Sequence, residues 1–164
     1  MTWSEDERRL LESRASRLQR ALRPEPSTPL PEAIIVSTAG IRVALLGTSV
    51  HGVRRLRTLT IAHSGPPDLL GVFAYGQQVL PAFRLSSALG RPPLPAERPH
   101  VLVVGASEPE LGLEVDRVLG VDLAELAPSD APFPLALCGR TMSGVPVLDA
   151  QALLDSPRLA LRSP

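Results

Sequence analysis

The sequence predicts a mainly β protein, built as small antiparallel barrels or as a sandwich. Short runs of Val, Leu, Ile and Phe recur from Ala33 onward, and turn residues separate them. The most informative runs are residues 71–85, GVFAYGQQVLPAFRL, and residues 111–121, LGLEVDRVLGV, both β-prone and broken by glycine. Neither contains a catalytic, metal-ligating or phosphate-cradling set, so the pattern indicates a surface that binds another protein.

A separate amphipathic helix is predicted within residues 1–23. Ser4 and Glu7 have the spacing of a capping box, and the acidic residues after Ser4 favour the positive end of the helix dipole. An apolar stripe follows at helical spacing and consists of Leu11, Ala15, Leu18 and Leu22. A proline-rich linker at residues 24–32 ends the helix, which either lies on its own domain or docks on a partner.

The remaining elements are predicted in chain order from apolar runs and turn signals. Ala39-Gly40 predicts a hairpin, and a helical turn is expected at residues 86–89. Asp149 is placed to cap a short helix through Leu154, and Pro146 predicts an edge or bulged strand. The predicted strands cover residues 34–38, 43–46, 50–59, 79–83, 100–104, 112–115, 118–121, 135–137 and 145–148.

Composition limits the possible classes of protein. A chain of 164 residues with 44% hydrophobic content suits one domain, or two small lobes that share a core. The formal net charge of zero provides no overall field that attracts nucleic acid or an anionic membrane. The single cysteine, the lack of a secretory leader and the lack of a run near the ~20 apolar residues of a membrane span predict a soluble cytoplasmic protein without membrane insertion.

The residues that could carry chemistry are isolated from one another. His51, His63 and His100 have no cysteine or second histidine at ligand spacing, so no metal or other cofactor is predicted. Cys138 has no nearby base and is interpreted as a small buried residue, while Asp116 is interpreted as a turn-forming carboxylate. We therefore expect a protein that is not an enzyme.

An alternative function uses the basic stretch that contains Arg54, Arg55 and Arg57. Small β-barrels bind nucleic acid through such stretches when aromatic side chains provide a stacking platform. An aromatic content of 3% makes that platform thin, so the nucleic-acid-binding module is the less favoured hypothesis.

The ordered set of motifs resembles the CheW family, adaptors that couple bacterial chemoreceptors to the histidine kinase CheA. The resemblance implies a CheW-like domain at residues 33–156, followed by a tail at 157–164. The motif residues that carry it are Pro66, Gly71, Val72, Pro81, Leu85, Gly112, Val115, Asp116 and Val118, with Val50 in the strand after the first hairpin.

The resemblance implies two small five-stranded β-barrel lobes around a shared core, with short connecting and C-terminal helices. It implies an adaptor without an active site, in the cytoplasm within chemoreceptor clusters. Its expected partner is a methyl-accepting chemoreceptor whose tip helix contacts Val50 and Val53. A CheA-type kinase or another CheW-like protein is the expected second partner.

Two positions depart from the family pattern. The family's Asn-Leu-Arg-Gly run reads Ala74-Tyr75-Gly76-Gln77 here, so Gly76 occupies the arginine position, and Arg84 replaces the usual aspartate. Because charges at an interface rim influence the choice of partner, we expect an altered interface at Tyr75, Gly76, Gln77 and Arg84. The sequence thus predicts an adaptor that retains receptor binding and has a weakened kinase contact.

Overall fold

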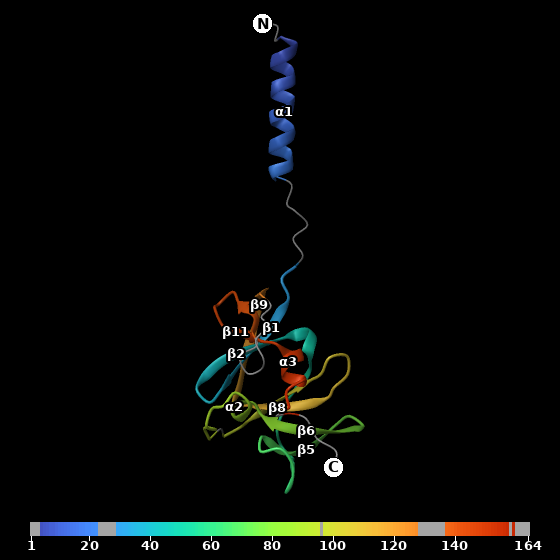
Figure 1. Ribbon diagram of the computed structural model, residues 1–164, viewed down its shortest axis with the longest axis vertical. Coiled ribbons are helices and arrows are strands. Elements are labelled where there is room, and N and C mark those ends of the chain that lie inside the picture. The colour runs from blue at the N-terminus through green and yellow to red at the C-terminus, as the bar shows by residue number, and fades with distance from the viewer. Residues whose placement is uncertain (1–3, 23–28, 96, 128–136, 158, 160–164) are drawn as a thin grey trace.

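The computed structural model describes residues 4–22, 29–95, 97–127, 137–157 and 159. Figure 1 shows two β lobes stacked end to end, with helices α2 and α3 between them, and confirms the mainly β prediction. The helical elements are α1 (Glu5–Leu22), η1 (Gly47–Ser49, a 3-10 turn), α2 (Leu85–Ala88) and α3 (Ala150–Leu154). The strands are β1 (Glu32–Thr38), β2 (Ile41–Leu46), β3 (Val50–Arg55), β4 (Thr60–Ile61), β5 (Leu69–Tyr75), β6 (Gln78–Arg84), β7 (His100–Val104), β8 (Leu111–Val115), β9 (Arg117–Leu126), β10 (Leu137–Thr141) and β11 (Pro146–Leu148).

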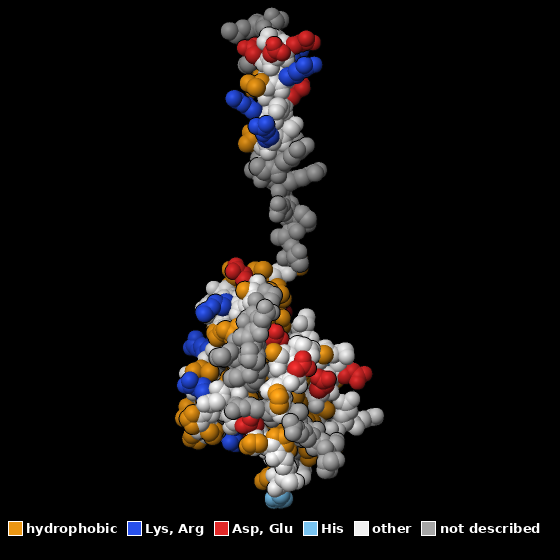
Figure 2. Space-filling model, viewed as in Figure 1, with side chains coloured by type: hydrophobic (Ala, Val, Ile, Leu, Met, Phe, Trp, Pro, Cys, Tyr) orange, Lys and Arg blue, Asp and Glu red, His pale blue; other side chains and the backbone are white. Residues whose placement is uncertain are grey.

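Helix α1 begins with the predicted capping box. The Glu7 backbone N–H donates to Ser4 Oγ at 3.3 Å, and the Ser4 backbone N–H donates to Glu7 Oε2 at 3.0 Å. Figure 2 shows acidic side chains at the start of the helix, followed by arginines and exposed apolar side chains. Leu11 and Leu18 are exposed, so the described part of the helix does not pack its apolar stripe on its own domain.

The first lobe is a closed barrel with the strand order β1-β2-β11-β10-β9. The predicted hairpin joins β1 to β2, and Ala39 and Gly40 have φ angles of 47° and 78°, as a type I′ turn requires. Pro146 does not lie on an edge strand, because β11 pairs with both β10 and β2, so the edge alternative was wrong. The register of the β10–β11 pair does shift, but in β10, between Leu137 and Gly139. Pro146 is instead the first residue of β11 and precedes the parallel pairing with β2, which begins at Val147.

The second lobe is a sheet of six strands in the order β3-β7-β8-β6-β5-β4, where we expected a five-stranded barrel. The additional strand, β4, pairs only with Gly71 and Val72 of β5. Strand β3 ends at Arg55, four residues before the predicted end: the Leu56 N–H still donates to Pro99 O at 3.1 Å, but proline has no N–H with which to continue the ladder. The two end strands, β3 and β4, do not pair with each other, so the lobe is open between them, and we call this opening the seam.

Two predicted strands differ in extent from those in the structure. Strand β9 begins near the predicted start but continues to Leu126, where it pairs with β10. Of the strand predicted at residues 135–137, only Leu137 is described, and it is the first residue of β10. Residues 135 and 136, the linker residues 24–28 and most of the predicted tail lie outside the described residues.

The lobes are joined by an apolar core to which both contribute. In β7, Val101 and Val103 point into the second lobe, whereas Leu102 and Val104 face the first lobe. Strands β1 and β2 alternate in the same way between the barrel interior and this shared interlobe core. Such strands are buried on both faces, which explains why they are almost continuously apolar. The buried members of the interlobe core are Val36, Val43, Leu45, Phe83, Leu85, Ala88, Leu102, Val104, Leu111, Leu113, Val115, Leu148, Leu153 and Leu159.

We predict that Leu113→Ala destabilises the whole domain. Leu113 is fully buried in the interlobe core, so its loss should lower the free energy of unfolding by about 2–5 kcal/mol. Urea unfolding followed by circular dichroism measures this change. The matched variant Leu126→Ala, at a side chain that is 53% exposed, should change it by less than about 0.5 kcal/mol. Equal effects of the two substitutions would contradict the interlobe core.

Candidate functional site

Val50 and Val53 lie on the same face of β3 despite their spacing of three residues. In a regular strand this spacing places two side chains on opposite faces. The register of β3 against β7 shifts between Val50 and Gly52, so that Val50 pairs with Val104 and Val53 pairs with Leu102. Both valines therefore face the interlobe side. Val50 is half-buried against the interlobe core, whereas Val53 is 41% exposed.

A groove of about 660 Å³ lies between the two lobes at the Arg55 end of β3, and neither Val50 nor Val53 is among its lining residues. Arg55 lines it and lies on the same face of β3 as Val53, since the two residues pair with alternate residues of β7. His100 also lines it, and its Nδ1 is buried without a hydrogen-bond partner among the described residues. The remaining lining residues are Ser37, Gly40, Leu94, Pro95, Glu97, Arg98, Asp116 and Arg117. With three arginines against two carboxylates, this interlobe groove is basic.

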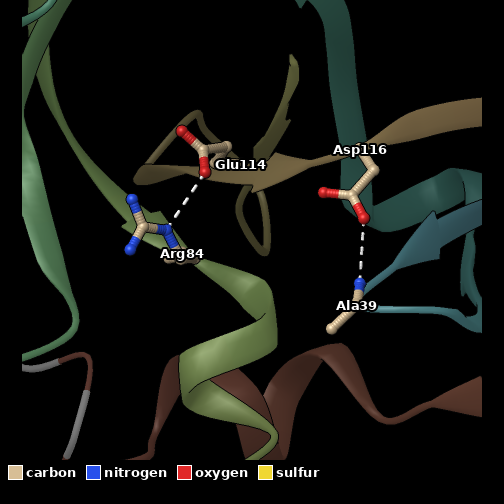
Figure 3. Close-up of polar contacts among 4 residues, drawn as sticks. All are labelled: Ala39, Arg84, Glu114 and Asp116. Atoms are coloured by element: carbon tan, nitrogen blue, oxygen red, sulfur yellow. Dashed lines mark hydrogen bonds and ion pairs between the residues drawn. The ribbon is translucent and has the colours of Figure 1, made fainter. Parts of the chain in front are cut away.

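Asp116 supports one wall of the interlobe groove. Its Oδ2 accepts a hydrogen bond of 2.9 Å from the Ala39 N–H (Figure 3). Its own N–H donates to Ser37 O at 2.9 Å. Ala39 has a left-handed backbone conformation that is costly for a residue with a side chain. Asp116 thus fixes the distant β1–β2 turn, a contact that its interpretation as a carboxylate forming the turn between its own two strands did not foresee.

Arg84 is paired within the second lobe. Its Nε lies 3.2 Å from Glu114 Oε1, and the two residues are cross-strand neighbours in the parallel pair β6 and β8 (Figure 3). The side chains are 35% and 18% exposed, so the ion pair is partly shielded from solvent. Glu114 was not recognised from the sequence as a site residue. It compensates the charge that Arg84 introduces.

Tyr75 connects two strands that are not neighbours in the sheet. Its hydroxyl donates to His51 O at 3.1 Å, and a Cβ added to Gly52 would lie 2.8 Å from that hydroxyl oxygen. The Arg54 guanidinium lies 4.7 Å from the centroid of the Tyr75 ring. Tyr75 therefore bridges β5 to β3 and partly closes the seam of the second lobe with its side chain.

Gly76 and Gln77 form the exposed tip of the β5–β6 hairpin. Gly76 has a φ of 60°, which suits the glycine at the first central position of a type II′ turn. A side chain here would meet no atom within 4 Å, but it would hold the backbone in a conformation that L residues seldom adopt. The backbone conformation at position 76 favours glycine, so the turn and the absence of the family's arginine at this position are consistent with each other.

The predicted motif residues occupy structural positions. A Cβ at Gly71 would collide with the carbonyl oxygen of Thr60, and one at Gly112 would collide with Phe73. Pro66 accepts a hydrogen bond from the Leu69 N–H at 3.0 Å in the turn before β5. In the sheets, Val115 is buried and the residues Val72, Pro81 and Val118 are half-buried.

Arg54, Arg55 and Arg57 line a second groove, of about 650 Å³, at the seam of the second lobe. All three are exposed. Phe73 also lines this seam groove but is only 7% exposed, so it offers little surface on which a base could stack. The sequence analysis identified these three basic residues but did not predict the groove that they line.

Cys138 and Asp122, two described residues with shifted pKa values, line neither groove. Burial, followed by the charge of Asp149, raises the pKa of the Cys138 thiol, which makes it a poorer nucleophile. Hydrogen bonds from Ser143 lower the pKa of Asp122. Within the described residues, no cluster of three or more His, Cys, Asp or Glu residues is arranged to hold a metal ion. None of the described helices has the length and apolar character needed to cross a bilayer.

The chain matches a known protein family and is similar in structure to a solved protein. The model of the CheW-like domain matches residues 32–159. The scaffolding protein TtCheW from Thermoanaerobacter tengcongensis has a similar structure, with a TM-score of 0.66 and 17% sequence identity. That match covers 81% of this chain and 99% of the TtCheW chain, and at this identity it shows a shared fold. No curated protein sequence matches this one.

We predict that Arg84→Asp destabilises the second lobe by placing two carboxylates side by side. The free energy of unfolding should fall by about 1 kcal/mol, since like charges on neighbouring strands repel. The double variant Arg84→Asp/Glu114→Arg restores an opposite pair and should recover part of the loss. Urea unfolding of both variants checks this, and a double variant no more stable than Arg84→Asp would contradict the pairing.

Proposed function

Because the chain belongs to the CheW-like domain family, whose members are scaffolding adaptors in chemotaxis, we propose that it binds a chemoreceptor tip helix on the interlobe side of β3. The observation that supports this site is the shifted register of β3, which brings Val50 and Val53 to the same face as Arg55, a residue that lines the interlobe groove. Val53 provides the accessible apolar contact, while Val50 supports it from the core.

Charge in the interlobe groove favours a helix with carboxylates next to its apolar contact. Arg55, Arg98 and Arg117 line this groove, and opposite charges across an interface accelerate association and discriminate between partners. The expected partner is thus a methyl-accepting chemoreceptor, as the family suggests, with a tip helix that combines an apolar face with acidic neighbours. No bond is made or broken in this role, so the protein acts without catalysis, in the cytoplasm at chemoreceptor clusters.

The contact with a CheA-type kinase is weaker in this protein than in members that carry the family's arginine. The hairpin tip has no charge at Gly76, and Gln77 beside it is neutral. Arg84 contributes little new charge, because Glu114 neutralises it within the sheet. The hairpin tip is therefore the main altered surface, and another CheW-like protein is an alternative partner there.

Val53→Asp should weaken binding to the receptor tip by more than tenfold, that is, by over about 1.4 kcal/mol, because it places an unpaired carboxylate in an apolar contact. Isothermal titration with the receptor tip fragment measures the affinity. The variant should fold normally, since Val53 is 41% exposed, whereas Val50→Asp would also disturb the core. The control Val121→Asp, at a valine that is 62% exposed on β9, should bind normally. Unchanged affinity for Val53→Asp would remove β3 from the receptor site.

Titration with the kinase regulatory domain should show weak binding by the native protein. The variant Gly76→Arg/Arg84→Asp/Glu114→Arg introduces the family's charges and keeps an opposite pair between β6 and β8. We expect it to bind at least about tenfold more tightly, because the rim regains its charge. Tight binding by the native protein, or no gain in the variant, would contradict this account of the kinase contact.

A further inference from the structure

The seam groove lies where the second lobe would close if its end strands met. Strand β3 forms one wall, and β5 with β6 forms the other, while the loop at residues 56–59 joins β3 to β4 at one end. The bridge from Tyr75 to His51 spans the same two walls. The seam groove is thus enclosed by elements of the second lobe, and its volume is about 650 Å³.

One wall of the seam groove is basic and has no acidic counterpart. Arg54 and Arg57 are exposed, and neither forms an ion pair with a described carboxylate. Arg54 pairs in register with Val101, which belongs to the core of the second lobe, so it faces away from the interlobe side of Val53. Its stacking on Tyr75 holds the guanidinium in position over the groove. This charge is therefore available to a ligand that is distinct from the receptor helix.

The opposite wall is apolar and offers a free sheet edge. Val72, Ala74 and Val79 line it, and Val79 is 69% exposed. Since β4 pairs only with Gly71 and Val72, residues 73–75 of β5 have a strand neighbour on the β6 side alone within the described structure. The backbone of an extended chain can pair with such an edge, and its side chains then alternate between the two faces.

We propose that the seam groove binds an extended acidic peptide segment of a partner protein, which adds a strand to β5 and directs carboxylates to Arg54 and Arg57. Alternate apolar side chains of the segment pack on Val72 and Val79. This site is independent of the proposed receptor function, because it uses the other face of β3.

Nucleic acid fits the seam groove less well than an acidic peptide. A single strand requires free aromatic faces for stacking, but Phe73 is 7% exposed and Arg54 already covers the Tyr75 ring. A peptide backbone uses the free edge of β5, which the bases and phosphates of a nucleic acid do not. The charge pattern and the edge together thus favour peptide.

The test uses the full chain and a fluorescein-labelled peptide, Glu-Val-Glu-Val-Glu-Val-Glu-Val, in a fluorescence anisotropy titration. We expect saturable binding that weakens as salt is raised, and hydrogen exchange that slows at the Ala74 amide, which points to the free edge because the alternate amides of Phe73 and Tyr75 point to β6. The variant Arg54→Gln/Arg57→Gln should bind at least about tenfold more weakly. The control Arg42→Gln/Arg91→Gln removes the same charge from exposed arginines outside the groove and should bind as the native protein does.

Three results would overturn the proposal. The first is equal binding of the matched peptide Lys-Val-Lys-Val-Lys-Val-Lys-Val, and the second is an equal loss of affinity in both arginine variants. The third is tighter binding of an oligo-dT strand that depends on Arg54 and Arg57, which would assign the groove to nucleic acid. An unchanged midpoint of thermal unfolding in each variant shows that a loss of affinity reflects the groove and not unfolding. As a further control, Val53→Asp should leave peptide binding unchanged.

Discussion

The interlobe core is the constraint on which the rest of the structure depends. Strands of both lobes bury one face in their own lobe and the other face in this shared core, as Leu102 and Val103 show on adjacent positions of β7. Apolar burial on both faces stabilises the pair of lobes as one unit and fixes their relative position. Many strand faces are used for packing, and the partner surfaces proposed here lie at edges, rims and hairpin tips.

Strand β3 shows how this constraint leaves surface for the proposed contacts. Its register shift places Val53 and Arg55 on the interlobe side, whereas Arg54 faces the seam of the second lobe. One short strand therefore contributes to two separate grooves. Tyr75 contacts this strand at two points. Its hydroxyl donates to His51 O at the register shift of β3, and its ring stacks against the Arg54 guanidinium. The two proposed contacts, with a receptor helix and with an extended peptide, thus use opposite faces of one strand.

Local chemistry could be predicted from the sequence because it involves neighbours in the chain. The capping box of Ser4 and the cap of Asp149, whose Oδ1 accepts from the Gln151 N–H at 3.0 Å, are both confirmed. The hairpin at Ala39-Gly40 is also confirmed, and the resemblance correctly indicated the overall family fold.

Long-range register could not be read from the sequence. The ion pair of Arg84 with Glu114 depends on the parallel pairing of β6 with β8, and the position of Val53 depends on an extra residue in β3. Pro146 misled the prediction because a first strand position tolerates proline as well as an edge does. These features arise only when distant segments are aligned, and a single-residue shift reverses the face that a side chain occupies.

The most direct test of the adaptor account is a nuclear magnetic resonance titration of the isotope-labelled protein with the receptor tip fragment. The account predicts that amide shifts change at Val53, Arg55 and His100, around the interlobe groove, while residues 73–75 at the seam remain unperturbed. Changes confined to the seam, to the outer face of β9, or to no region at all would contradict it.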